Sequence, residues 1–109
     1  MNNDDRIAAP HAFAHALRVQ RDAALLGFDW PEISGVVDKV SEETDELRTA
    51  LAAGDETHAA SELGDLFFAA VSVARFLNAN PERCLYEATR RFQLRLELVK
   101  KIAVEREFS

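Results

Sequence analysis

The chain has 109 residues and a formal net charge of −6, from 13 basic and 19 acidic side chains. A chain of this length forms one domain, and its acidic balance argues against a nucleic-acid polymer or an anionic membrane as the partner, because both bind clustered lysine and arginine. The single cysteine, Cys84, excludes an internal disulfide and leaves no Cys/His spacing for zinc, which favours a reducing compartment.

No apolar run approaches the roughly 20 residues that a membrane span needs. The start of the chain, MNNDDRIAAP, also lacks the basic and then apolar layout of a signal peptide. We therefore expect a soluble, cytoplasmic protein with no membrane partner. We expect a flexible arm over residues 1–9, followed by a single domain over residues 10–109.

Apolar side chains recur three and four positions apart, which is typical of helices, and no strand-like alternation is present. Four helices are predicted, over residues 10–26, 32–53, 56–77 and 81–104. Gly27 and Gly54 suit the ends of the first two helices. Asp55 and Asn80 suit N-caps, and Pro81 suits a first helical position. The sequence therefore predicts an all-α, four-helix bundle-like domain.

The link through Gly54 is short, so the second and third helices should form an antiparallel hairpin. The predicted buried stripes are Ile33, Val36, Val37, Val40, Leu47 and Leu51 on the second helix, and Leu63, Leu66, Phe67, Ala70, Ala74 and Leu77 on the third. On the first helix, Arg18, Gln20 and Arg21 are interpreted as solvated side chains. Contact with a ligand near the following GFDW turn is the alternative.

Two pairs of carboxylates lie on this hairpin at a spacing of three, which places each pair on one helix face. The pairs are Glu43 with Glu46, and Glu62 with Asp65. Glu46 lies eight positions before Gly54 and Glu62 eight positions after it, so the hairpin brings both pairs to one level. Four carboxylates this close repel one another unless a cation lies between them, and Mg²⁺ prefers oxygen ligands. The alternative is two solvated acidic faces that lysine and arginine neighbours offset.

A di-iron carboxylate site is a rival metal interpretation, but it requires ExxH motifs. The three histidines, His11, His15 and His58, complete no such motif after Glu43 or Glu62. Ligation by oxygen alone indicates Mg²⁺ or Mn²⁺ and favours phosphoryl or nucleotidyl transfer. Gly64, between two of the carboxylates, suggests close approach of another group to the helix backbone.

Three runs of the chain, GFDWPEISGVVDKVSEETDEL, ELGDLFFAAVSVARFL and EATRRFQLRL, carry a resemblance over about residues 17–101. They resemble the MazG family of all-α nucleoside triphosphate pyrophosphohydrolases, in which an ExxE pair precedes an ExxD pair on the next helix. The resemblance implies Mg²⁺-dependent hydrolysis of ribo- or deoxynucleoside triphosphates to monophosphate and pyrophosphate, in housekeeping of the nucleotide pool. It also implies at least a homodimer, with a tetramer as the other possibility.

The resemblance assigns roles to individual positions. The implied metal ligands are Glu43, Glu46, Glu62 and Asp65, and the implied phosphate contacts are Lys39, Arg91 and Arg95. Glu42, turned about 100° around the helix from Glu43, is the candidate base for the attacking water, and Glu43 can share that role. Trp30 is a candidate contact for the nucleobase, and packing of its turn on the helices is the competing interpretation.

Thr89 stands where this family usually has asparagine, and Arg91 replaces a lysine, which we interpret as a change in substrate preference. Two other functions stay open. A phosphoribosyl-ATP pyrophosphatase uses a related helical site, although its match to GFDW and EATRRF is poorer. A non-catalytic helical interaction module would bind no divalent metal at the four carboxylates.

Overall fold

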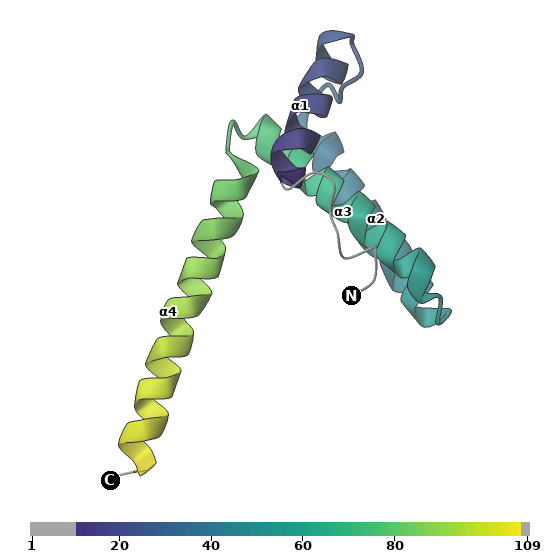
Figure 1. Cartoon of the computed structure of the whole chain (residues 1–109). Coiled ribbons are helices and arrows are strands. Elements are labelled where there is room, and N and C mark those ends of the chain that lie inside the picture. The colour runs from purple at the N-terminus through teal and green to yellow at the C-terminus, as the bar shows by residue number, and fades with distance from the viewer. Residues whose placement is uncertain (1–10, 108–109) are drawn as a thin grey trace.

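The computed structural model describes residues 11–107, and every element in this range is an α-helix. The helices are α1 (Ala12–Leu25), α2 (Ile33–Ala52), α3 (Glu56–Phe76) and α4 (Pro81–Glu107), as Figure 1 shows. The all-α class and the four predicted helices are confirmed. The predicted arm over residues 1–9 and the predicted first helical residue, Pro10, lie outside the described residues.

Glycines follow the ends of the first two helices, and side-chain caps precede the last two. Gly27 and Gly54 have positive φ angles of 89° and 70°, which residues other than glycine rarely adopt. The Asp55 side chain accepts a hydrogen bond from the His58 backbone N–H at 3.0 Å. Asn80 Oδ1 accepts one from the Glu82 N–H at 2.9 Å. Both predicted N-caps are therefore confirmed.

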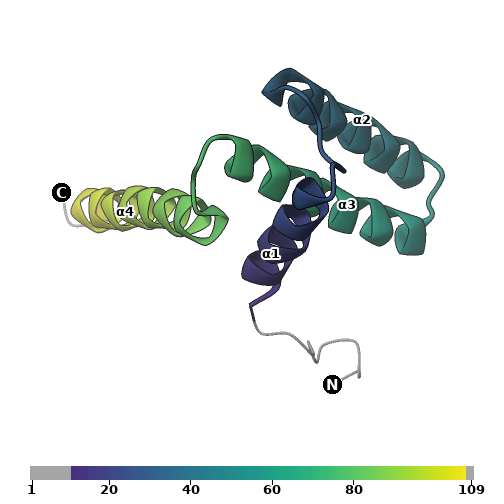
Figure 2. The same cartoon turned by 90° about the horizontal axis from the view of Figure 1, so that it is seen from above.

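The helices α2 and α3 form the antiparallel hairpin, and α1 lies across α3 (Figure 2). Phe13 of α1 meets Phe67 of α3 edge to face, with ring centroids 6.1 Å apart. Small side chains make up the buried apolar core: Val36, Ala50, Ala59, Ala69, Val71 and Ala74. The core of a single chain is therefore thin.

The fourth helix projects away from the other three (Figure 1). None of its residues is buried, and in the described range it contacts α1 and α3 but not α2. The radius of gyration is 18.3 Å, whereas a compact domain of this length has about 13 Å. The bundle that four helices would form is therefore open in a single chain, because α4 does not lie along the hairpin.

Several large apolar side chains that the helical pattern predicts to be buried are exposed instead. At least half of the residue surface is exposed in Leu51 of α2, and the same is true of Phe67 and Leu77 in the stripe predicted for the third helix. Further exposed apolar side chains lie along α4: Leu85, Phe92, Leu94, Leu96, Leu98, Val99 and Ile102. When two helices pack together, each one buries only a narrow strip of the other's surface. The apolar side chains outside that strip therefore remain exposed. No helix in residues 11–107 combines the length and the hydropathy that crossing a membrane requires.

Candidate active site

The hairpin brings the two pairs of carboxylates together. Glu43, Glu62 and Asp65 each offer an oxygen atom within 4.8 Å of the others, and Glu42, Glu43 and Glu46 form a second such group. Glu43 belongs to both groups and so connects them. Glu46 and Glu62 line one hollow, as expected from a hairpin register centred on Gly54. We call the five residues of these two groups the carboxylate cluster.

Two members of the carboxylate cluster are buried. Glu43 is 4% exposed and Glu62 is 8% exposed, while the other three members are exposed. Glu43 Oε1 lies 3.0 Å from Lys39 Nζ, and Glu62 Oε1 lies 2.9 Å from His58 Nε2. The second oxygen of each carboxylate, Oε2, is also buried and has no hydrogen-bond partner among the described residues. A buried carboxylate oxygen without a partner is costly, and a bound cation would satisfy it.

The pKa values of Glu43 and Glu46 are shifted in opposite directions by their charged neighbours. A hydrogen bond from Lys39 is the main reason that the pKa of Glu43 lies below its ordinary value, although burial opposes this shift. The pKa of Glu46 is raised, first by a hydrogen bond to Glu62 and then by the charges of Glu43 and Glu62. One lysine therefore does not neutralise the cluster, and the negative charge of Glu46 is disfavoured by its acidic neighbours.

The donor set of the cluster fits a hard divalent cation. All of its candidate ligand atoms are carboxylate oxygens, the atoms that Mg²⁺ and Mn²⁺ prefer. Ligand oxygens at about 2.1 Å from Mg²⁺ lie roughly 3–4 Å from one another in an octahedron. The oxygen atoms of each group, within 4.8 Å of one another, lie close to this spacing.

A hollow of about 310 Å³ opens beside the cluster. Its walls are Trp30, Lys39, Glu43, Asp65, Phe68 and Ala69. Aromatic, cationic and acidic side chains therefore meet in one space. Phe68 was not among the predicted site residues, although its position three residues after Asp65 places both on one face of α3.

The remaining predicted site residues lie in two places. Glu42 is exposed, and its Oε1 atom lies 3.4 Å from Lys39 Nζ at the edge of the cluster. Arg91 and Arg95 are exposed on α4, which leads away from the hairpin (Figure 1). A single chain does not bring these two arginines to the carboxylates, so their contact with phosphate stays a prediction.

Comparison with known proteins adds to this geometry. A family model described as a MazG nucleotide pyrophosphohydrolase domain matches residues 33–102, which include all four predicted metal ligands. The nucleoside triphosphate pyrophosphohydrolase/pyrophosphatase MazG of Thermotoga maritima is 40% identical over 91 residues, which cover 84% of this chain and 34% of that protein. The nucleoside triphosphate pyrophosphohydrolase of Escherichia coli K12 is 37% identical over 105 residues, 94% of this chain and 40% of that protein.

This chain thus spans only about a third to two-fifths of the length of these relatives. The match over most of the helical hairpin and of α4 shows that the chain belongs to the MazG family.

Proposed function

We propose that this chain hydrolyses ribo- or deoxynucleoside triphosphates to the monophosphate and pyrophosphate, with Mg²⁺ as the cofactor and Mn²⁺ as a substitute. The observation that carries this proposal is the pair of buried, unpartnered oxygens of Glu43 and Glu62 within an all-oxygen cluster. The names of two relatives, both nucleoside triphosphate pyrophosphohydrolases, support the substrate class. We place the reaction in the cytoplasm, where the exposed thiol of Cys84 stays reduced, and in housekeeping of the nucleotide pool.

In this proposal Glu43, Glu46, Glu62 and Asp65 hold the metal. When bound, Mg²⁺ supplies charge neutralisation for the phosphate oxygens and for the leaving pyrophosphate. His58 Nε2–H donates to the Glu62 carboxylate at 2.9 Å and so fixes the orientation of that carboxylate.

The bond cleavage uses the exposed side of the cluster. Glu42 accepts a proton from a water molecule, whose oxygen attacks the α-phosphorus. The bond from this phosphorus to the α–β bridging oxygen breaks, and its electron pair leaves with pyrophosphate. Lys39 binds the terminal phosphates through its ammonium group, which now lies 3.0 Å from Glu43. Glu43 is the second candidate for the base.

The base of the nucleotide occupies the hollow beside the cluster in this proposal. Trp30 is 43% exposed and Phe68 49% exposed, so each offers part of an aromatic surface there. Such surfaces stack on any nucleobase, because every base has a π face. Trp30 is therefore the proposed base contact.

We also propose that the active form is at least a homodimer, in which α4 of one copy covers apolar surface of another. The exposed leucines, Phe92 and Val99 of α4 support this, because each such side chain contributes about 1.5–3 kcal/mol when fully buried. In such an assembly, Arg91 and Arg95 of one copy could reach the phosphates at the cluster of another. A planar guanidinium suits this role through paired hydrogen bonds to phosphate oxygens.

A hydrolysis assay in ¹⁸O-labelled water tests the proposed reaction. We expect equal amounts of monophosphate and pyrophosphate, with the label in the monophosphate, and no turnover without a divalent cation. Label in pyrophosphate, or release of orthophosphate, would place the attack on a different phosphorus. Glu43→Gln and Asp65→Asn should each remove most of the activity while circular dichroism stays unchanged. Binding of no divalent cation by the unmodified chain would support a non-catalytic interaction module instead.

A further inference from the structure

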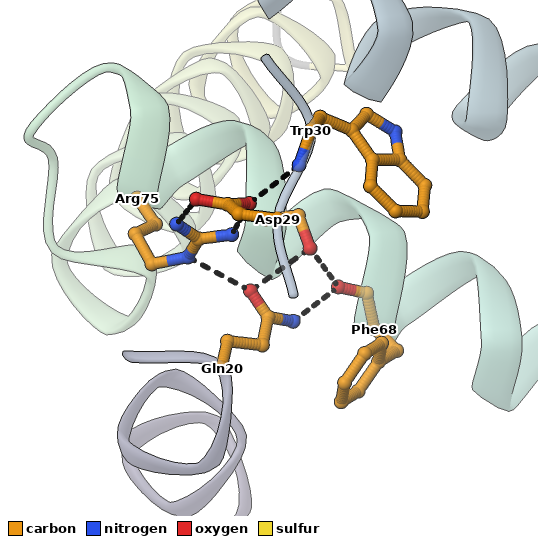
Figure 3. A network of polar contacts seen from close by, with 6 residues as sticks. Gln20, Asp29, Trp30, Phe68 and Arg75 are labelled. Atoms are coloured by element: carbon orange, nitrogen blue, oxygen red, sulfur yellow. Dashed lines mark hydrogen bonds and ion pairs between the residues drawn. The ribbon is translucent and has the colours of Figure 1, made fainter. Parts of the chain in front are cut away.

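A polar network joins the turn before α2 to both α1 and α3 (Figure 3). The guanidinium of Arg75 on α3 donates two hydrogen bonds to the carboxylate of Asp29 in the turn, both 2.8 Å long. The Nε–H of Arg75 also donates to the side-chain oxygen of Gln20 on α1, at 3.3 Å. One guanidinium therefore connects three separate parts of the chain.

The network fixes the position of Trp30. Asp29 Oδ1 accepts a hydrogen bond from the Trp30 backbone N–H at 2.9 Å, in addition to its bond with Arg75. The indole ring lies against α2 at Gly35, where an added Cβ atom would come within 3.1 Å of Trp30 Cδ1. The turn is thus held from α3, and the indole itself is held against α2.

The network also reaches Phe68. The Gln20 side-chain amide is 6% exposed and donates to the Phe68 carbonyl oxygen at 2.9 Å. Ser72 donates to Gln20 Oε1 at 2.8 Å, so both ends of this amide are satisfied. Trp30 and Phe68 are the two aromatic side chains that line the hollow beside the carboxylate cluster.

Burial alone does not fix the orientation of these two rings. Each retains more than two-fifths of its surface, and hydrophobic packing within this chain therefore fixes only part of each ring. The charge-assisted, bidentate Arg75–Asp29 contact holds the turn whose backbone carries Trp30, because its geometry is specific. The hollow of about 310 Å³ is at the lower end of the range for small-molecule sites.

We infer that Asp29, Arg75 and Gln20 are positioning residues that set the geometry of a nucleobase site between Trp30 and Phe68. This inference rests on the proposed function, in which the hollow receives a nucleotide. The three residues act on the backbone at Trp30 and Phe68, which carries the two aromatic rings, and they do not themselves contact the phosphates. They therefore control affinity for the base and leave the chemistry at the carboxylates unchanged.

The test compares substrates with and without a base, using the whole chain of 109 residues. Asp29→Asn and Arg75→Lys each remove the bidentate ion pair, and we expect the KM for a nucleoside triphosphate to rise about 5- to 20-fold, the scale of one lost stacking contact. The kcat should change less than about twofold. Inhibition by inorganic tripolyphosphate, which has no base, should also change less than about twofold.

Trp30 is the single tryptophan of the chain, so fluorescence reports on it directly. Nucleotide binding should quench its emission, and the half-saturating concentration should rise in the Asp29→Asn variant as the KM does. Gly35→Ala provides a second variant that displaces the indole from the α2 side without altering the network. Arg48→Gln, which removes a solvent-exposed ion pair with Asp45 on the same helix, is the matched control and should change none of these values.

Two results would overturn the inference. One is an equal loss of tripolyphosphate and nucleotide affinity in Asp29→Asn, which would indicate a general structural role. The other is an unchanged KM and unchanged quenching in both Asp29→Asn and Gly35→Ala. If the unmodified chain releases no pyrophosphate from any triphosphate, the proposed function fails instead, and the quenching titration still decides whether the network shapes a base site.

Discussion

Replacement of Glu62 by glutamine should have opposite consequences with and without a divalent cation. Glu62 is buried, its Oε2 atom has no hydrogen-bond partner within residues 11–107, and carboxylate oxygens of Glu43 and Asp65 lie within 4.8 Å. A glutamine keeps the shape of the side chain and an oxygen for His58 but removes one negative charge from the cluster. Without metal, we therefore expect the melting temperature of Glu62→Gln to equal or exceed that of the unmodified chain.

Added Mg²⁺ should reverse this order. A cation that binds only the folded chain stabilises it by about 2.7 kcal/mol at a concentration of 100 Kd. If the lost charge weakens binding tenfold, the same concentration stabilises Glu62→Gln by only about 1.4 kcal/mol. At roughly 4 °C per kcal/mol for a domain of this size, the expected shifts are about 11 °C and about 6 °C.

Differential scanning calorimetry with and without Mg²⁺, at one protein concentration, measures both shifts. Asp22→Asn, which removes an exposed carboxylate of α1 outside the cluster, is the control and should keep the full magnesium shift. An equal magnesium shift in Glu62→Gln would refute the assignment of Glu62 as a ligand. A large loss of stability in metal-free Glu62→Gln would refute the view that the negative charge of Glu62 is uncompensated in the unmodified chain.

Three further outcomes are expected. Phe92→Asp should convert the assembly to a monomer of 12.2 kDa in light scattering, because a charge would replace an exposed apolar ring on α4. A monomeric unmodified chain would contradict the proposed assembly. The hydrogen bond from Arg75 lowers the pKa of Asp29, so this pair stabilises the fold above the ordinary pKa of 3.8 and loses that effect as the pH falls through the lowered value. In urea titrations at pH 7, Asp29→Asn should have a lower free energy of unfolding than the unmodified chain, and this difference should shrink below about pH 4. A difference that grew in acid would contradict the stabilising role of the ionised Asp29. Gly64→Ala should raise stability by about 0.5–1 kcal/mol, because an added Cβ atom meets nothing within 4 Å, and a loss would show that another molecule packs there.

The sequence predicts the parts of this fold that depend on local chemistry. Glycine at 27 and 54 and the caps at Asp55 and Asn80 act within a few residues, so the helix bounds agree closely with the structure. The hairpin register follows from a single short link at Gly54. That register alone places Glu46 and Glu62 side by side.

Long-range contacts could not be predicted in the same way. Gln20 was expected to be solvated, yet it is buried because Phe68, Ser72 and Arg75 of α3 supply its hydrogen-bond partners. Asp29 and Arg75 are 46 positions apart, and no helical period connects them. Gly64 was expected to mark a close approach, but among residues 11–107 nothing beyond the backbone of its own helix lies within 4 Å of an added Cβ atom.

The direction of α4 carries the largest consequence for function. Periodicity predicts that a helix has an apolar face, but it does not state which molecule covers that face. Here the face of α4 that includes Phe92, Leu96 and Val99 remains exposed, and the same helix carries Arg91 and Arg95. In the proposed reaction, a metal ion and these basic groups together offset the negative charge of the triphosphate beside an acidic cluster. If a second copy covers the apolar face of α4, assembly also determines where the arginines lie. Burial of apolar surface and completion of the phosphate site would then be one event.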